Sequence, residues 1–335
     1  MSTKIYQYFS APRRVPGEKK KGCIIFMPQK VKPISIGSRV EMFVDDFLVF
    51  RTFGTQLKLA QPQPREIVLT MDQPWEGPGS GIYSCVFHDG EKYRMYYRGT
   101  GNTAAKSGGD LSEAQYNCLA VSADGIHWER PSLGLVEVEG SADNNIVLSG
   151  QKAHNFSPML DTNPNTPPEQ RYKAVAGYGA KGLMAYCSAD GIHWEELQKE
   201  PVITSGAFDS HNLCLYDPNR KIYRCYSRYF AQPGDSNAVC QGEGMINIGV
   251  RSIQSSTSED FRSWTAPKPN QYPADVPQEQ FYTNATVLCP GAEHQYLSFP
   301  MRFMSERHKV EEHPHVGLSD AVFMSSRDEI GRAHV

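Results

Sequence analysis

The chain has 335 residues, of which 39% are hydrophobic and 21% charged, and it carries a formal net charge of −3 at pH 7. This balance offers no basic footprint for nucleic acid, and no apolar run approaches the length of a membrane span. The eight cysteines form no CxxC pair and accompany no His-rich spacing, so we expect neither a metal site nor a cofactor.

Residues 1–38 are predicted to form a poorly ordered N-terminal arm. Basic residues stand at positions 13, 14 and 19–21, but the apolar block that follows, residues 23–27, is too short for the hydrophobic region of a secretory signal. The sequence therefore shows no signal peptide and leaves the compartment open. Residues 40–50 alternate Val, Phe and acidic residues and predict the first strand.

Further along, one short phrase returns: Ser, any residue, Asp, usually Gly, and Trp three residues later. Its Asp residues are Asp124, Asp190, Asp260 and Asp328, at spacings of 66, 70 and 68 residues. A fixed period with turn residues at fixed offsets is typical of a repeat architecture. In a Ser-x-Asp turn the short side chains bond backbone N–H groups, so we interpret these acids as structural. The Trp of each copy is expected to pack between repeats.

Each period also contains short β-rich runs bounded by Asp-Gly or Asp-Pro turns, and no segment has a sustained helical period. The third period, for example, has such runs at 212–216, 223–228 and 246–251 before its Ser-x-Asp turn. Four strands per repeat, arranged radially, make a propeller blade. We therefore predict an all-β fold, a five-bladed β-propeller of four-stranded antiparallel blades over residues 39–328. Residues 40–50 are expected to complete the last blade.

The last seven residues, 329–335, break the repeat where Gly and Trp should follow. Residues 330–335 match a common sequencing-library adapter translated in frame, and such scars are excluded from fold reasoning. We expect a fragment whose natural sequence continues beyond this point.

Candidate functional residues stand just before each predicted inner strand, because these positions converge on the propeller axis. The inner strands start near Ile82, Asn155, Asn212 and Asn284. The preceding residues differ between repeats, and they are Trp75 and Glu76, then His154, then Phe208, Asp209 and His211, then Glu279 and Tyr282. Here the repeat loses its symmetry and offers carboxylates.

Two carboxylates across a glycosidic bond are sufficient for hydrolysis, and a third carboxylate nearby separates their pKa values. Glu76, Asp209 and Glu279 are the candidates, with Asp45 or Asp46 as replacements for Glu76. Adjacent aromatic rings would stack on a sugar, while Asn and His would bond its hydroxyls. The competing interpretation is that each is an ordinary solvated loop acid. Asp161, at the far turn of its strand, is interpreted as structural.

A family resemblance is carried by residues 43–48, 72–76, 93–98, 143–147, 171–173, 208–212 and 282–284. In this order they resemble the five-bladed propeller glycoside hydrolases, a group with arabinanase-, β-xylosidase-, levansucrase- and invertase-like enzymes. They are most similar to bacterial proteins related to glycoside hydrolase families 43 and 32. The resemblance covers residues 40–328 and implies three acids from three inner strands. The chain has no Asn-Asp-Pro-Asn-Gly, Arg-Asp-Pro or Glu-Cys pattern at the expected places, which leaves substrate and mechanism open.

The resulting prediction is a glycoside hydrolase acting on a furanoside or related oligo- or polysaccharide. Asp209 would be nucleophile or base, Glu279 the general acid, and Glu76 the orienting group. The expected substrate contacts are His211, Asn212, Asn155, His154, Asn284, Tyr282 and Trp75. Arg98, Arg228 and Arg302 are interpreted as structural ion-pair partners. Two alternatives remain: a glycan-binding propeller without turnover, and a phosphorylase, for which Arg171, Lys173 and Arg228 would supply the basic pocket.

Overall fold

A computed structural model describes residues 33–327 except 57, 59, 78, 102–114, 178–180, 241–248, 274–275 and 308–316. The described chain is all-β, as predicted, and it includes two short 3₁₀ turns, η2 (Gly150–Ala153) and η3 (Pro168–Gln170). Within these ranges no helix is long and apolar enough to cross a membrane. The predicted arm (1–38) lies almost entirely outside the described residues, and the tail (329–335) lies wholly outside them.

The first two sheets are antiparallel and follow chain order from their first strand outward. The first contains β1 (Cys85–His88), β2 (Tyr93–Gly99), β3 (Tyr116–Ser122) and β4 (Trp128–Glu129), with β5 (Ile146–Ser149) also paired to β3. The second contains β6 (Ser157–Leu160), β7 (Tyr172–Gly177), β8 (Leu183–Ser188) and β9 (Glu195–Glu196).

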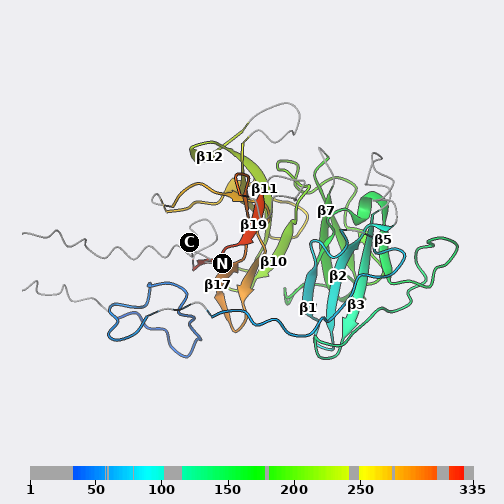
Figure 1. Cartoon of the computed structure of the whole chain (residues 1–335), viewed down its shortest axis with the longest axis horizontal. Helices are drawn as coiled ribbons and strands as arrows, with labels where there is room; N and C mark the ends of the chain where they lie inside the picture. The colour runs from blue at the N-terminus through cyan, green and yellow to red at the C-terminus, as the bar shows by residue number, and fades with distance from the viewer. Residues whose placement is uncertain are drawn as a thin grey trace, which may run out of the picture.

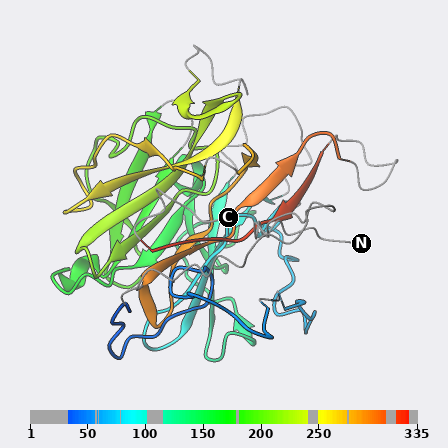
Figure 2. The ribbon, with the colours of Figure 1, turned by 90° about the vertical axis from the view of Figure 1, so that its left-hand side faces the viewer.

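The third sheet repeats the order, with β10 (Leu213–Asp217), β11 (Ile222–Gln232), β13 (Val250–Ser258) and β14 (Lys268–Pro269), and with β12 (Asp235–Val239) at the end of β11. The fourth contains β16 (Thr286–Cys289), β17 (Ala292–Ser298) and β20 (Met324–Ser326). A fifth, small sheet of β15 (Gln280–Phe281), β18 (Met301–Met304) and β19 (Leu318–Ala321) continues the fourth, because each of its strands adjoins one of those strands along the chain. In Figure 2 the strands of the fourth and fifth sheets, coloured orange and red, form one continuous run.

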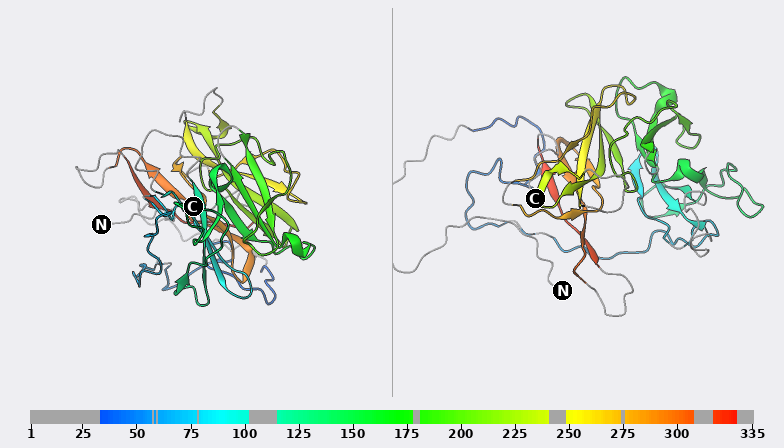
Figure 3. Two further views of the ribbon diagram at one scale, coloured as in Figure 1. Left: turned by 90° about the vertical axis from the view of Figure 1, so that its right-hand side faces the viewer. Right: turned by 90° about the horizontal axis from the view of Figure 1, so that it is seen from above.

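The sheets are arranged as in a propeller, with their first strands in contact in series: β1 with β6, β6 with β10, and β10 with β16. Figure 1 shows the first two sheets on one side of the molecule and the third and fourth on the other, and Figure 3 shows the same order from above. Apolar side chains fill the space between neighbours. Between the second and third sheets, for example, Leu183 and Val175 pack in one buried cluster with Phe208, Tyr216 and Tyr223.

Neighbouring sheets are also joined by Asp–Tyr contacts at the C-terminal ends of the inner strands β1, β6 and β10, which we call the outgoing ends. Tyr172 donates to Asp89 Oδ2 at 3.0 Å, Tyr223 donates to Asp161 Oδ2 at 2.7 Å, and Tyr296 donates to Asp217 Oδ2. In each pair the Tyr lies on the second strand of the following sheet. A basic side chain completes each site, respectively Arg94, Lys173 and Arg220. The structural interpretation of Asp161 is therefore confirmed.

The repeated Ser-x-Asp turns have the predicted structure. In the first, Asp124 Oδ1 accepts the backbone N–H groups of Ile126 and His127, both at 2.8 Å, and Ser122 Oγ accepts that of Gly125 at 2.9 Å. The turns at Asp190 and Asp260 repeat the two bonds to their Asp. Asp328 lies outside the described residues. Trp194 packs between sheets as expected, edge-on to the ring of Phe156 (4.9 Å) and to that of Tyr96 (6.1 Å).

The prediction of a strand at 40–50 is wrong, because these residues have no strand structure. They contact the fourth sheet through side chains instead. Arg327, just after β20, donates to Asp45 Oδ2 at 2.7 Å and to Glu41 Oε2 at 2.6 Å, and Gln295 of β17 accepts the Met42 N–H at 3.3 Å. Phe43, Phe47 and other apolar residues of this segment are exposed, so strand pairing does not bury its Val and Phe side chains.

Candidate functional site

Several residues that precede inner strands lie together at one end of the sheets. We call this cluster the mouth, and it contains Tyr83, Asp209, His211, Tyr282, Arg228 and Arg251, with Glu279 at its edge. The rings of Tyr83, before β1, and His211, before β10, stack with centroids 5.5 Å apart. Tyr83 holds a left-handed backbone conformation (φ +59°), which costs free energy for a residue other than glycine and marks functional sites more often than ordinary turns. Burial and the neighbouring Tyr282 raise the pKa of Tyr83 to about 12, against the effect of Arg228, so its hydroxyl stays protonated.

His211 is enclosed behind Tyr83. Burial lowers the pKa of His211 to about 4, and its Nε2 lies 3.3 Å from Cys85 Sγ. Burial also raises the pKa of Cys85 to about 12. Both groups are therefore neutral near pH 7, and the pair has no thiolate for nucleophilic chemistry.

Asp209 is the exposed acid of the mouth, with 61% of its side chain accessible. Arg228 of β11 donates from Nη2 to Asp209 Oδ1, while its own side chain is only 4% exposed. The Arg228 guanidinium also lies 5.2 Å from the ring centroid of Tyr282. The predicted acid Asp209 and the predicted aromatic contact Tyr282 are thus brought together by an arginine.

A second arginine, Arg251 of β13, lies on the other side of this cluster. Its guanidinium is 5.3 Å from the Tyr282 ring centroid and 5.9 Å from that of Phe230, and its Nη1 donates to Gln280 at 2.7 Å. Burial, then the charge of Arg228, lowers the pKa of Arg251. The two guanidinium groups therefore act on each other as like charges.

Glu279 immediately precedes β15 of the small sheet, at the edge of the mouth, and shares one cation with a second acid. Arg302 of β18 donates from Nη1 to Glu279 Oε1 at 2.7 Å, and from Nε and Nη2 to the two oxygens of Asp320 at 2.9 and 2.8 Å. The two carboxylates are 24% and 27% exposed. The ion-pair interpretation of Arg302 is confirmed, and Asp320 is an acid that the sequence pattern did not single out.

The predicted hydroxyl contacts at the inner-strand starts are buried and bonded within the protein. Asn155 Nδ2 and Asn212 Nδ2 both donate to the backbone oxygen of Phe208, at 3.2 and 2.9 Å, and Asn284 Nδ2 donates to that of His211 at 3.0 Å. His154 Nδ1 lies 2.8 Å from Gln115 Oε1. Asn155 and Asn284 thus join one sheet to the next, and contact with substrate stays a prediction for all four residues.

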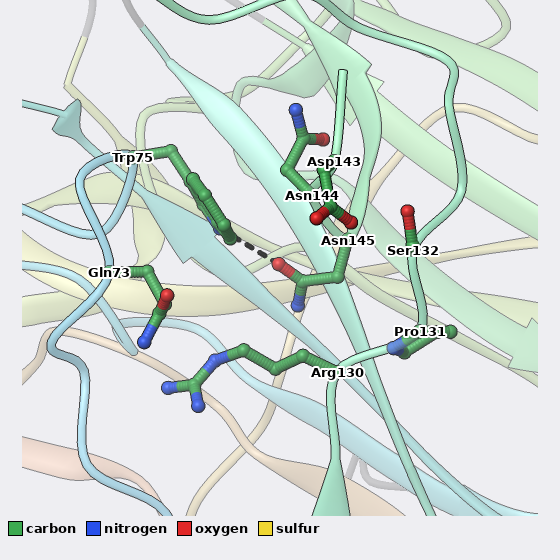
Figure 4. Close-up of a pocket in the computed structure, with 8 residues that line it drawn as sticks. All are labelled: Gln73, Trp75, Arg130, Pro131, Ser132, Asp143, Asn144 and Asn145. Carbon is green, nitrogen blue, oxygen red and sulfur yellow. Dashed lines mark hydrogen bonds between the residues drawn. The ribbon is translucent and has the colours of Figure 1, made fainter. Parts of the chain in front are cut away.

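Glu76 and Trp75 lie in the segment before β1, against the first sheet, and not in the Asp209 cluster. The Glu76 side chain is 0% exposed, and Arg130 donates to both of its oxygens at 2.9 Å. Tyr97 also donates to Glu76, and Trp75 Nε1 donates to Asn145 Oδ1 at 2.8 Å. Figure 4 shows Trp75 and Arg130 lining a hollow of about 200 Å³. An acid enclosed in this way serves to hold the 70–77 segment against the sheet.

The other predicted acids and bases lie away from the mouth. Asp45 is paired with Arg327. Lys173 is paired with Asp161, and Arg171 donates to the backbone oxygen of Asp89 at 2.6 Å, both at the outgoing ends of inner strands. Of the three basic residues considered for a phosphate pocket, only Arg228 is at the mouth. Among the described residues, no group of three or more His, Cys, Asp or Glu could hold a metal ion.

No family model and no curated protein matches the chain. Solved structures similar to it include an N-acetylgalactosamine deacetylase from F. plautii in complex with blood group B trisaccharide (14% identity, 82% of this chain, 73% of that chain, TM-score 0.47). They also include a GH43 endo-arabinanase from Bacillus licheniformis (10% identity, 75% of this chain, 76% of that chain, TM-score 0.42). A third is a structure from the GH130 family of mannoside phosphorylases (14% identity, 78% of this chain, 70% of that chain, TM-score 0.43). The chain is thus similar to glycoside hydrolases of the kind its motifs resemble.

Proposed function

We propose that this protein is a carbohydrate-active propeller that hydrolyses glycosidic bonds, with Asp209 and Glu279 as the catalytic pair. The observation that carries the proposal is an exposed carboxylate, Asp209, in one cluster with the rings of Tyr83 and Tyr282. Carboxylates supply the acid and base of glycoside hydrolysis, and aromatic faces hold sugar rings.

The surroundings of the two acids support different roles. Asp209 accepts a hydrogen bond from Arg228, a contact suited to an ionised carboxylate acting as nucleophile or base. Glu279 shares Arg302 with Asp320. Both carboxylates therefore contact one guanidinium, beside the mouth. In this proposal Glu279 is the general acid and Asp320 takes the orienting role for which Glu76 is too enclosed.

We also propose that the ring has five blades and closes between the first and fourth sheets. Exposed valines on the two end sheets support this. Val86 of β1 and Val287 of β16 are 54% and 46% exposed, whereas Pro158 and Cys214, at the register position of Val86 in the second and third sheets, are buried. An inner-strand valine left open at both end sheets is the arrangement expected where a further blade packs.

The test is turnover of 4-nitrophenyl α-L-arabinofuranoside, arabinan and levan by Asp209→Asn and Glu279→Gln variants. Each change should lower kcat by about 10²- to 10⁴-fold without lowering the melting temperature. Glu259→Gln, an exposed acid of a Ser-x-Asp turn, is the matched control and should keep full activity. Near-wild-type rates in both mouth variants would refute the assignment. A wild-type protein that binds these glycans without cleaving them would establish the non-catalytic alternative.

A further inference from the structure

The Arg228 side chain has donors that its acid partner does not use. Only Nη2 donates to Asp209, while Nε and Nη1 are buried and have no hydrogen-bond partner among the residues that the structure describes. A guanidinium remains charged at any ordinary pH and offers five N–H donors in a planar fork. Buried donors of this kind are normally satisfied. Arg228 is therefore an incompletely satisfied cation whose guanidinium end reaches the mouth.

Arg302 provides the comparison within the same structure. All three of its nitrogens bond carboxylate oxygens, which belong to Glu279 and Asp320. Among the described residues it thus has two acids where Arg228 has one, and that acid, Asp209, is largely exposed. Every nitrogen of Arg302 has a partner, whereas Nε and Nη1 of Arg228 have none within the described ranges, and the ion pair with Asp209 does not account for them.

A second cation, Arg251, lies near Arg228. Arg251 lies near enough for its titration to be affected by Arg228, and both guanidinium groups lie within 5.3 Å of the Tyr282 ring centroid. Two fixed cations beside a half-buried aromatic ring form a site for an anion that is attached to, or adjacent to, a sugar ring.

We propose that the mouth binds an oxyanion through Arg228 and Arg251, next to the sugar that stacks on Tyr282. The anion is a carboxylate or sulfate group of an acidic glycan, or inorganic phosphate bound beside the glycosidic bond. The sugar part of this inference rests on the proposed carbohydrate function, whereas the anion part does not. Asp209 occupies one donor of Arg228, so it competes with the oxyanion.

The experiment is calorimetric titration of the full chain with sodium glucuronate, methyl glucoside, sodium sulfate and sodium phosphate in separate runs at constant ionic strength. Glucuronate should bind at least about tenfold more tightly than the neutral methyl glucoside if the anion is part of the glycan. Phosphate binding stronger than glucuronate binding would identify the anion as free phosphate. The site is overturned if none of the three anions binds more tightly than methyl glucoside.

Variants connect the binding to these residues. Arg251→Gln should weaken the anion that binds by roughly tenfold or more, and Arg228→Lys should weaken it less because the charge is kept. Asp209→Asn should strengthen it, a gain that misfolding cannot imitate. Lys199→Gln, which removes an exposed charge beyond the outermost strand of the second sheet, should change nothing. An Asp209→Asn variant that binds every anion more weakly than wild type would contradict the proposal.

The two proposals fail separately. Equal binding of glucuronate and methyl glucoside, unaffected by Arg251→Gln, would remove the anion site and leave a sugar site. Binding of sulfate or phosphate without either sugar would retain the anion site and remove the carbohydrate function.

Discussion

Charged groups at the two ends of the inner strands follow different rules. At the outgoing ends, Asp89, Asp161 and Asp217 each contact a Tyr of the next sheet and a basic residue, so one arrangement is repeated three times. At the mouth no arrangement repeats. Asp209 is exposed beside a buried arginine, while Glu279 shares a cation with a second acid.

This difference separates structural charge from charge available for function. Contacts that recur in every interface are accounted for by packing one sheet on the next. The mouth has lost that regularity, and it also has Arg228 with unused donors and Tyr83 with a strained backbone. Departures from local rules of this kind are expected at functional sites.

The largest effect that tests the comparison is expected at Asp161. Its side chain is 0% exposed and bonds Lys173, Tyr223 and Thr166. Asp161→Ala leaves a buried lysine without its acid, and loss of one partner of a buried pair costs about 3–5 kcal/mol. Urea unfolding followed by tryptophan fluorescence should give this loss in the free energy of unfolding.

Asp209→Asn is the matched change at the mouth. It retains an oxygen that can accept from Arg228 at an exposed position, so we expect a loss within about 1 kcal/mol. Equal destabilisation by the two variants would show that the mouth and the Asp–Tyr contacts do not differ in the way proposed.

A smaller effect, dependent on pH, is expected at His211. Its pKa is lowered by burial from 6.5 to about 4, so between these values the unfolded chain binds a proton that the folded chain does not. Stability is therefore fully present above pH 6.5 and is lost as the pH falls towards 4, by roughly 3 kcal/mol in total.

His211→Gln should remove this component. Wild type and variant are compared by urea unfolding at pH 7.0 and 4.5, and the wild type should lose more stability than the variant between them. Parallel pH dependence in both proteins would mean that His211 is not the buried neutral group described above. A smaller pH dependence in the variant would instead show that the mouth contains a group that stabilises the fold, His211, as well as its acids.

The sequence predicted those features that depend on neighbours in the chain. The Ser-x-Asp turns and the order of the strands are set by local hydrogen bonds and hairpins, and both are present. The contact of Tyr223 with Asp161, by contrast, joins residues 62 positions apart, which no local pattern predicts. Arg251 and Asp320 reach the site in the same way, through pairing of distant strands, and no local pattern marks them.

Two expectations from the sequence depended on where a segment packs in the fold, which the local sequence pattern does not determine. Residues 40–50 have the composition of a strand, but their partners on the fourth sheet are the side chains of Arg327 and Gln295. Glu76 stands beside an aromatic residue in a loop, as a catalytic acid would, but Arg130 from after β4 folds back onto it. A carboxylate in a loop has the same sequence signal whether it is exposed or enclosed.

The smallest effect separates backbone strain from packing at a repeated turn. Gly191 has φ +74°, and a Cβ there would lie 2.6 Å from the Tyr96 hydroxyl and 2.9 Å from Arg94 Nη1, both from the neighbouring sheet. Gly234 has φ +85° with nothing within 4 Å of its Cβ position. Alanine at either site has the cost of a left-handed conformation, about 1–2 kcal/mol. Gly191→Ala should therefore be about 1–2 kcal/mol less stable than Gly234→Ala, because it also displaces an inter-sheet contact. If urea unfolding gives the same loss for both, the Ser-x-Asp turn is a local hairpin device and contributes nothing to the docking of one sheet on the next.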